Sequence, residues 1–387
     1  MSNPRHLAQM SAARSVSGHA AVVRLAWIFG DRDTPMLLRQ PVFVEAVRHR
    51  HKVLILAPDL SAADQALLAT QGIDSAPIGL PGNRFNPFAA VTARRRLAQV
   101  LHDWRASAAI VEDGEALELA VRAAVQAGIP AVYPLLPALE AGAGPSESKL
   151  SWRHALSLAN AVFVPTPNDA RLLAEPLAKL GVPYHQLPVI TLDLDRIRAH
   201  PLPPIDDGFL FLGCDGGTGG GQMTPFAEAV TALDSRASRA RFRLAEIHPA
   251  LITAKASPRL ERITVTSPIA ETLAELVRAA HIVVVDGLGA QQTLLLGLAL
   301  AVGRPVLVTH DACYRDFVDV GANGWLAPRG DAAALAQCMA TILKRPDLLP
   351  GMARAARQKA ERRLDQRVVV PLLFKALGLS DLRVQVA

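Results

Sequence analysis

Short apolar runs alternate with helical stretches along most of the chain from Val22 onward. The runs that we expect to form strands in the first half are residues 22–29, 53–57, 73–78, 108–111, 131–133, 162–164 and 187–192. These runs are mainly apolar and lack regular alternation, which is typical of parallel strands covered by helices on both faces. Between them, Ser61 is placed to cap a helix that Gly72 ends, and residues 87–102 and 115–126 have the pattern of further helices.

The same alternation restarts after a proline-dense segment at residues 200–208. The strands expected in this second half are residues 209–212, 242–245, 263–266, 282–285 and 306–308. The helices expected there are residues 225–237, 269–279, 291–302 and 332–343. The sequence therefore predicts an α/β protein of two Rossmann-like, doubly wound domains that face a cleft, with ligands beyond the carboxyl ends of the strands.

The domain boundaries follow from this pattern. We expect a disordered basic tail over residues 1–18, an N-terminal domain over 19–198 and a linker over 199–208 that acts as a hinge. A C-terminal domain follows over 209–365. Residues 366–387 are predicted to be a helix and tail that packs back on the N-terminal domain.

Charge is spread unevenly over the 387 residues, whose net charge is +6. Residues 1–105 hold 13 Lys and Arg against 7 Asp and Glu, with the densest runs at 48–52 and 94–96. Such a surface attracts anionic lipid, phosphorylated substrates or nucleic acid, although solvated helix faces explain it equally well. We exclude nucleic acid as a partner because no aromatic residues interleave with the basic runs.

The cysteines and the hydropathy of the chain indicate the cellular compartment in which the protein is found. The three cysteines, Cys214, Cys313 and Cys338, have no CxxC spacing, which favours buried thiols in a reducing compartment over a disulfide framework or a metal site. The sequence shows no apolar run long enough to span a membrane and no secretory signal pattern. We therefore predict a cytoplasmic protein, peripheral on the inner face of the membrane if the basic surface binds lipid.

Several motifs resemble those of the group 1 glycosyltransferases, family 4, which have the GT-B fold and act in bacterial surface-polysaccharide assembly. Residues 323–331 (NGWLAPRGD), with the later segments 346–347 and 352–357, resemble the family's C-terminal signature. Residues 298–306 (LALAVGRPV) resemble its helix-Gly-x-Pro-Val step, and residues 187–196 resemble its interdomain strand and turn. The likeness covers nearly the whole chain and is strongest after Leu187.

The residues that carry chemistry in that family are mostly replaced here. Residues 213–222 (GCDGGTGGGQ) hold no cation where the family has an Arg and a Lys for the donor's diphosphate. The two glutamates of its Glu-x7-Glu motif fall on Ala290 and Leu298. The family's acceptor-side histidine has no counterpart in residues 133–137 beyond a distant tyrosine, Tyr133. The catalytic residue is therefore unknown from sequence.

Two loops are the candidate donor site. Six glycines within residues 213–221 can turn backbone amides toward an anion, and Pro225 begins a helix whose positive end lies there, although a flexible loop is an equal explanation. Polar side chains at the start of the 291–302 helix can donate hydrogen bonds to the donor, although helix capping explains them almost as well. The candidate donor-binding residues are Gly216, Gly217, Thr218, Gly219, His248, Gln291, Gln292 and Thr293.

The resemblance implies acceptor contact in a loop that contains Asn83, Arg84 and Asn86, where turn formation is the alternative. Other carboxylates are weaker candidates. Glu112, Asp113 and Glu115 follow a strand end, where acid/base groups are placed in such folds, but Glu115 also suits a helix start. Asp311 and Asp316 fit surface positions, although Asp316 stands where the family often has Glu.

By resemblance, the expected activity is transfer of a sugar from a UDP- or GDP-sugar to a lipid-linked saccharide, with retention of configuration. No metal and no obligatory cofactor are expected. Further partners would be the membrane surface and proteins of an assembly complex. The alternative is a catalytically inactive GT-B-like scaffold, partner or sensor protein, which the missing cations and glutamates favour.

Overall fold

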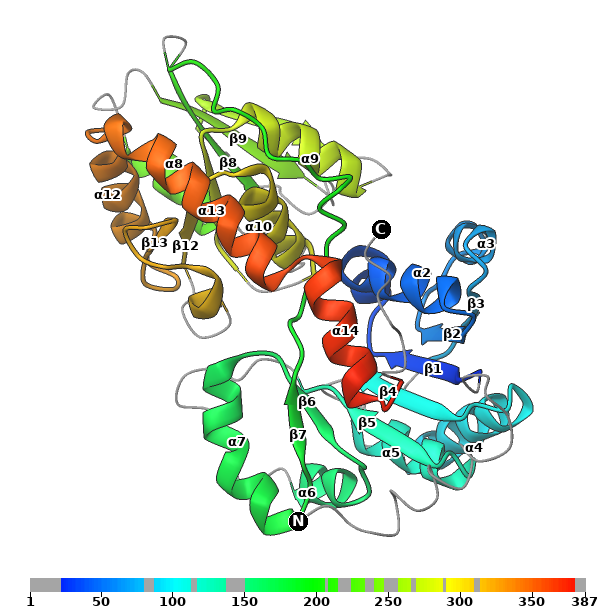
Figure 1. Ribbon diagram of the computed structural model, residues 1–387. Coiled ribbons are helices and arrows are strands. Elements are labelled where there is room, and N and C mark those ends of the chain that lie inside the picture. Colours follow the sequence, from blue (N-terminus) through cyan, green and yellow to red (C-terminus); the bar gives the residue numbers. More distant parts are fainter. Residues whose placement is uncertain are drawn as a thin grey trace. The chain divides into compact units, whose positions relative to one another are not determined.

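The computed structural model describes residues 22–79, 87–112, 117–136, 150–205, 208–214, 224–233, 240–246, 257–265, 269–287, 290–309 and 314–379. The chain forms two compact units (Figure 1). Unit 1 comprises residues 1–188 and 370–387, and unit 2 comprises residues 189–369. The predicted tail, 1–18, lies outside the described residues.

Unit 1 is built on a five-stranded parallel sheet of order β3-β2-β1-β4-β5. Its strands are β1 (Arg24–Phe29), β2 (Lys52–Ala57), β3 (Asp74–Pro77), β4 (Ala108–Glu112) and β5 (Ala131–Pro134). The central strand β1 is buried along almost its whole length, and Trp27 pairs in register with Ile55 on one side and Ile110 on the other. The strands expected from the apolar runs are thus confirmed here.

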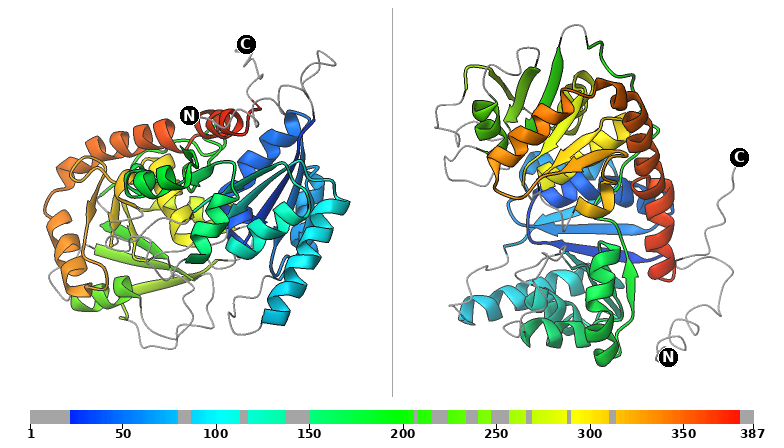
Figure 2. Two further views of the ribbon diagram at one scale, coloured as in Figure 1. Left: turned by 90° about the horizontal axis from the view of Figure 1, so that it is seen from below. Right: turned by 90° about the vertical axis from the view of Figure 1, so that its left-hand side faces the viewer.

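Helices cover both faces of this sheet (Figures 1 and 2). The helices of unit 1 are η1 (Pro35–Arg39, a π-helix), α2 (Gln40–Arg48), α3 (Ala62–Thr70), α4 (Pro87–Asp103), α5 (Leu117–Gln126), α6 (Leu150–Ser157) and α7 (Pro167–Leu180). As predicted, Ser61 caps α3: its hydroxyl accepts a bond from the Asp64 amide, and the Asp64 carboxylate accepts one from the Ser61 amide. A second, two-stranded sheet pairs β6 (Val162–Val164) with β7 (Tyr184–Gln186).

Unit 2 has the same type of architecture, with a six-stranded parallel sheet of order β10-β9-β8-β11-β12-β13. Its strands are β8 (Phe209–Cys214), β9 (Ala240–Glu246), β10 (Leu260–Thr264), β11 (Ile282–Val285), β12 (Val306–Val308) and β13 (Gly324–Leu326). Its helices are α8 (Pro225–Ala232), α9 (Ile269–Ala279), α10 (Ala290–Val302), η5 (Arg315–Phe317), α12 (Ala332–Ile342), η6 (Pro346–Leu348) and α13 (Leu349–Arg363). Two doubly wound domains, as predicted, thus form the molecule.

The chain passes between the units twice, at residues 188–189 and again at 369–370 within α14 (Gln366–Ala376). The strand expected over residues 187–192 is not formed, because Pro188 lacks an amide hydrogen and the chain changes units there. Only Leu192 makes a β-bridge, to Asp365. In unit 1, Phe374 on the second half of α14 lies edge-on to the rings of His49 and His51.

The proline-dense segment that we expected to be the linker is attached to unit 2. The fully buried guanidinium of Arg304 donates to the carbonyl oxygens of His200 at 2.7 Å and Pro201 at 2.8 Å. Arg304 also donates to the Arg278 carbonyl at 2.8 Å. Residues 199–205 are therefore held in place by unit 2, and the change of unit comes earlier, at Pro188.

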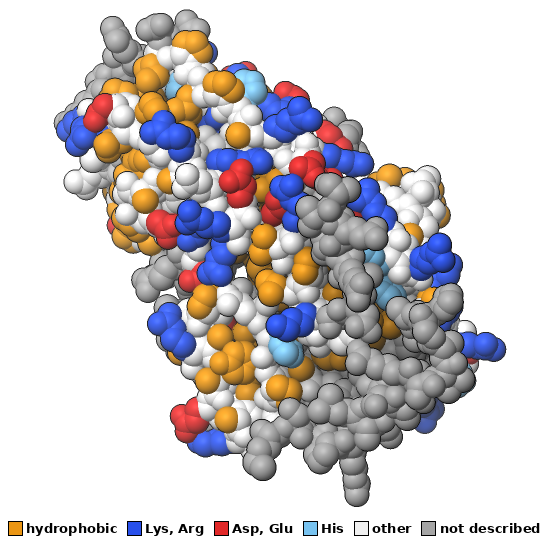
Figure 3. Space-filling model, in the orientation of Figure 1, with side chains coloured by type: hydrophobic (Ala, Val, Ile, Leu, Met, Phe, Trp, Pro, Cys, Tyr) orange, Lys and Arg blue, Asp and Glu red, His pale blue; other side chains and the backbone are white. Residues whose placement is uncertain are grey.

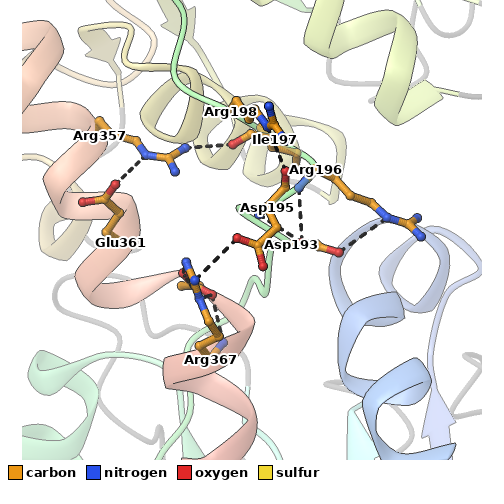
Figure 4. A network of polar contacts seen from close by, with 9 residues as sticks. Asp193, Asp195, Arg196, Ile197, Arg198, Arg357, Glu361 and Arg367 are labelled. Carbon is orange, nitrogen blue, oxygen red and sulfur yellow. Dashed lines mark hydrogen bonds and ion pairs between the residues drawn. The ribbon is translucent and has the colours of Figure 1, made fainter. Parts of the chain in front are cut away.

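A polar network holds the segment after Pro188 against α13 and α14 (Figure 4). Arg357 donates to the carbonyls of Ile197 and Ala301 and is paired with Glu361. Arg367 is paired with the buried Asp365 and lies 3.4 Å from Asp195. Ion-paired residues of unit 2 thus lie close in sequence to both points at which the chain passes between the units.

Candidate functional site

The strand order of unit 2 reverses between β8 and β11. After β8 the chain adds β9 and β10 on one side, and after β11 it adds β12 and β13 on the other. Open α/β sheets bind ligands beyond the carboxyl ends of the strands at such a reversal, because the two connections leave in opposite directions. The starts of α8 and α10, which follow β8 and β11 in the chain, are therefore the elements that would hold a ligand in unit 2.

The backbone amides in the first turn of α8 are already hydrogen-bonded to protein groups. Pro225 has no amide hydrogen, the Phe226 amide donates to Asp286 Oδ2 at 2.7 Å, and the Ala227 amide donates to the Thr224 hydroxyl at 3.2 Å. Asp286 follows β11, so its carboxylate joins the end of β11 to the start of α8. The sequence indicated that backbone amides of the glycine segment bind an anion near the positive end of this helix, and the glycine candidates at residues 216–219 lie outside the described residues. The Phe226 and Ala227 amides themselves are already bonded to protein oxygens.

The first turn of α10 is different. The helix is apolar and buried from Leu294 to Val302, and its polar residues are gathered at its start, at Gln291, Gln292 and Thr293. Gln292 is fully buried, and within the described ranges neither its amide nitrogen nor its amide oxygen has a hydrogen-bond partner. A buried polar group without a partner costs about 1–3 kcal/mol, so a ligand that bonds to this amide would gain that much.

A second segment reaches the same turn of α10. The hydroxyls of Thr293 and Tyr314 lie 3.3 Å apart. Two residues further on, the half-buried Asp316 has one buried carboxylate oxygen, Oδ2, that no residue in the described part of the chain bonds. We expected Asp316 to be a surface acid and did not single out Tyr314. The one signal for Asp316 was its position, where the resembling family has Glu.

Most of the other candidate residues lie outside the part of the chain that the structure describes. These are the donor candidates Gly216, Gly217, Thr218, Gly219 and His248, the acceptor candidates Asn83, Arg84 and Asn86, and the acids Asp113, Glu115 and Asp311. The start of the glycine segment is described: Gly213 and the buried Cys214 end β8. The structure therefore brings together only the α10 part of the candidate donor site.

Unit 1 has its own strand-order reversal, between β1 and β4, and an ion pair occupies it. The fully buried Arg39 donates from Nη2 and Nε to the Glu112 carboxylate, at 2.7 Å for the closest pair of atoms. Trp27 Nε1 donates to the same carboxylate at 3.2 Å, and Arg39 Nη1 donates to the Pro188 carbonyl at 2.6 Å. Glu112 is among the carboxylates that the sequence places for acid/base work, but its oxygens are occupied by structural donors.

Tyr133 is the remaining titratable group of the segment where the family has a histidine. It lies on β5, is buried, and contacts the ring of Phe163 with centroids 5.8 Å apart. Burial raises the pKa of its hydroxyl above the ordinary value of 10.0. Tyr133 therefore does not ionise near neutral pH.

Among the described residues, no group of three or more His, Cys, Asp or Glu side chains is placed to hold a metal ion. None of the helices in the described ranges is long and apolar enough to cross a membrane.

The fold matches solved structures along nearly its full length. The Anabaena protein Alr3699/HepE in complex with UDP superposes with a TM-score of 0.66 at 14% identity, covering 92% of this chain and 100% of that one. Sucrose-phosphate synthase from Thermosynechococcus elongatus gives 0.69 at 14% identity, covering 92% and 98%. UDP-GlcNAc 2-epimerase from Neisseria meningitidis, bound to UDP-GlcNAc, gives 0.63 at 17% identity, covering 91% and 100%. The protein has the GT-B fold, as predicted.

The sequence comparisons define the relationship more closely. Residues 222–345 match the family model described as glycosyl transferases group 1. A 73-residue segment is 40% identical to the putative colanic acid biosynthesis glycosyltransferase WcaL of Escherichia coli, covering 18% of each chain. The amylovoran biosynthesis glycosyltransferase AmsK of Erwinia amylovora is 34% identical over 80 residues, covering 20% of this chain and 19% of that one.

A phosphatidyl-myo-inositol mannosyltransferase of Mycobacterium leprae is 32% identical over 118 residues, which cover 30% of this chain and 31% of the relative. The matched segments thus span between about a fifth and a third of these relatives. The resemblance to GT-B glycosyltransferases of group 1 is confirmed.

Proposed function

We propose that the protein is a glycosyltransferase of glycan or surface-polysaccharide assembly that takes a nucleotide sugar as donor. The observation that carries the proposal is the fully buried amide of Gln292, which no described residue bonds, in the first turn of α10 beside the strand-order reversal of unit 2. The names of the related glycosyltransferases and the UDP complex of the Anabaena protein support it. These relatives do not favour the alternative of an inactive scaffold.

In this proposal the donor's diphosphate is held by neutral groups. Ala290 and the buried Leu298 stand where the family has its two glutamates, and residues 209–233 contain no Lys or Arg. A helix start carries a partial positive charge, and amide donors placed there stabilise the negative charge that develops on a leaving diphosphate. Gln291, Gln292 and Thr293 supply this contact, with the glycine segment at 216–219 and His248 as further donor-binding residues.

The finer parts of the proposal concern the acceptor and the location. The acceptor is a lipid-linked saccharide that contacts Asn83, Arg84 and Asn86, next in sequence to α4. Transfer proceeds with retention of configuration, with no obligatory metal, on the cytoplasmic side of the membrane, together with proteins of an assembly complex. These assignments rest on the family resemblance stated above.

The test is calorimetric titration of the full chain with UDP, GDP, ADP and CDP and then with their sugar conjugates. We expect micromolar binding of UDP or GDP and of one sugar conjugate. No binding across the panel, by a sample that is folded by circular dichroism and thermal melting, would overturn the donor assignment and support the inactive scaffold.

A further inference from the structure

Two side chains of unit 2 have buried polar atoms that no described residue bonds, and they follow neighbouring strands. Gln292 lies in the first turn of α10 after β11, and Asp316 lies in η5 after β12. Because β11 and β12 are paired and parallel, the segments that follow them leave from the same edge of the sheet. The hydroxyls of Thr293 and Tyr314, 3.3 Å apart, bring these two segments into contact. The contact lies one residue from Gln292 and two residues from Asp316 along the chain.

The bonding capacity of these atoms defines what a ligand must offer. In Gln292 they are the amide nitrogen Nε2, a donor, and the amide oxygen Oε1, an acceptor. In Asp316 the atom is the carboxylate oxygen Oδ2, a second acceptor. An acceptor that is buried without a donor is unfavourable, so a ligand that donates to these two oxygens would be stabilised by them.

Asp316 differs from other acids of unit 2, several of which are paired with cations. Asp319 lies 2.9 Å from Lys359. Glu361 lies 2.8 Å from Arg357. On the face of unit 2 that Figure 3 shows, acidic side chains lie beside basic ones. Asp316 makes no ion pair with any residue in the described ranges, so no cation there competes for its buried oxygen.

A phosphate group does not provide what both acceptors need. Near neutral pH a diphosphate offers acceptor oxygens, so it can accept a bond from Gln292 Nε2 but can donate none to Gln292 Oε1 or Asp316 Oδ2. The like charge of a carboxylate also repels it. A hydroxyl group both donates and accepts, so a hydroxylated ring is the chemistry that fits these atoms.

We propose that Asp316 is a specificity-determining residue, which accepts a hydrogen bond from a hydroxyl of the donor's sugar, with the Gln292 amide oxygen as a second acceptor. Gln292 Nε2 then remains available to the diphosphate. The first turn of α10 begins at Ala290 and contains no acidic residue, and Asp316 supplies a carboxylate there from the segment after β12. The inference rests on the proposed function and deepens it, because the donor is then selected by its sugar as well as by its nucleotide.

The experiment compares the affinity of the full chain for a nucleoside diphosphate with that for its sugar conjugates, by calorimetry in EDTA. The probes are UDP, GDP, UDP-glucose, UDP-galactose, UDP-N-acetylglucosamine and GDP-mannose. Asp316→Asn should lower the affinity for the conjugate that binds about tenfold, because a charged acceptor is lost. It should leave the affinity for the matching diphosphate unchanged, since only the conjugate carries the sugar hydroxyls.

The matched control is Asp319→Asn, the same replacement at an exposed carboxylate three residues further on. It should change neither affinity. Both affinities are measured on one sample, so a folding defect in Asp316→Asn would lower them together, whereas loss of the sugar contact lowers only one. The melting temperature of Asp316→Asn should equal that of the parent, because no described residue bonds the replaced oxygen.

Three results would overturn the inference. They are unchanged affinities in Asp316→Asn, an equal loss for diphosphate and conjugate, which would indicate the ribose hydroxyls instead, and an equal loss in Asp319→Asn, which would indicate net charge alone. A parent protein that binds a diphosphate but none of the conjugates would also overturn it, while leaving the nucleotide site intact. A folded parent protein that binds none of the six probes would overturn the proposed function itself, so the two failures are distinguishable.

Discussion

At the scale of single residues, Gln292 is a fully buried side chain whose amide has no hydrogen-bond partner among the described residues. Replacing Gln292→Leu removes an unpaired amide, so we expect the melting temperature to stay the same or rise. The same change should weaken binding of the nucleotide donor at least tenfold, because hydrogen bonds to charged groups contribute about 1.5–3 kcal/mol. Calorimetry on both proteins measures the effect.

The matched control is Gln337→Leu, the same replacement at an exposed position on α12 of the same unit. It should leave donor affinity unchanged. Equal donor affinity in the Gln292→Leu variant and the parent would contradict the assignment of this amide to the site.

Arg39 is the residue on which the strand-order reversal of unit 1 depends. Arg39→Met leaves the Glu112 carboxylate and the Pro188 carbonyl without their main donor, and we expect a loss of about 3–5 kcal/mol in the free energy of unfolding. The double variant Arg39→Met with Glu112→Gln should recover part of this loss, since no charge is then left buried. Urea denaturation monitored by circular dichroism gives these values.

The control for Arg39 is Arg48→Met. Arg48 is 59% exposed in its side chain and pairs with Glu45, and surface pairs contribute about 0–1 kcal/mol. If Arg39→Met cost no more than Arg48→Met, the buried pair would have no special structural role.

At the scale of elements, the packing of β8 against α8 fixes one glycine. A Cβ added to Gly213 would lie 2.4 Å from the ring of Phe226, the second residue of α8. We expect Gly213→Ala to destabilise the protein by about 1–3 kcal/mol, because the ring or the helix must shift. Gly351→Ala is the control: no atom lies within 4 Å of its added Cβ, so its stability should equal or slightly exceed that of the parent. Denaturant midpoints that coincide for both variants would show that α8 moves freely.

Elements with a continuous apolar pattern were predictable, whereas those decided by tertiary contacts were not. Strands such as β1 and β11 are buried along their length, and buried strands require apolar residues, so the sequence alone indicates them. Residues 187–192 are equally apolar, yet they pass between units and meet α13 and α14 rather than a sheet. The proline-rich segment after residue 199 has the composition of a linker, but the buried Arg304 attaches it to unit 2.

At the scale of the whole molecule, the GT-B fold follows from two repeats of the same alternating pattern, and the comparisons agree. The site was predictable only in part. Gln291, Gln292 and Thr293 stood out because polar residues open an otherwise apolar helix. The bond from the Phe226 amide to Asp286 joins residues 60 positions apart, and the contact of Tyr314 with Thr293 joins residues 21 positions apart. A local sequence pattern does not reveal contacts between residues so far apart.

Each unit contains a histidine that must stay neutral, and this couples the stability of both units to pH. Nδ1 of His51 accepts from the Val23 amide in unit 1, and Nδ1 of His281 accepts from the Leu210 amide at 3.0 Å in unit 2. Burial lowers the pKa of both imidazoles below the ordinary 6.5, and His49 lowers that of His51 further. For His281, backbone hydrogen bonds with Pro204 and Pro203 oppose the shift of the pKa, and Arg304 and Arg241 add smaller lowering contributions. Protonation at Nδ1 would place a second donor against each amide.

Below about pH 6.5 the unfolded chain therefore binds more protons than the folded one, and the free energy of unfolding falls as the pH falls. The carboxylate of Asp64 does not mask this effect. Hydrogen bonds from Arg32 and Ser61 hold the pKa of Asp64 at about 2, so its stabilising contribution is lost only below its ordinary 3.8. We predict a melting temperature that drops between about pH 7 and pH 5.

His281→Asn tests the origin of this drop. The asparagine oxygen can take the place of Nδ1 as acceptor for the Leu210 amide, but it does not titrate. The variant should keep the stability of the parent near pH 7.5 to within about 1 kcal/mol and lose less of it on acidification. A melting temperature that depends on pH equally in both proteins would mean that His281 does not control the acid sensitivity of unit 2, and that groups outside this contact do.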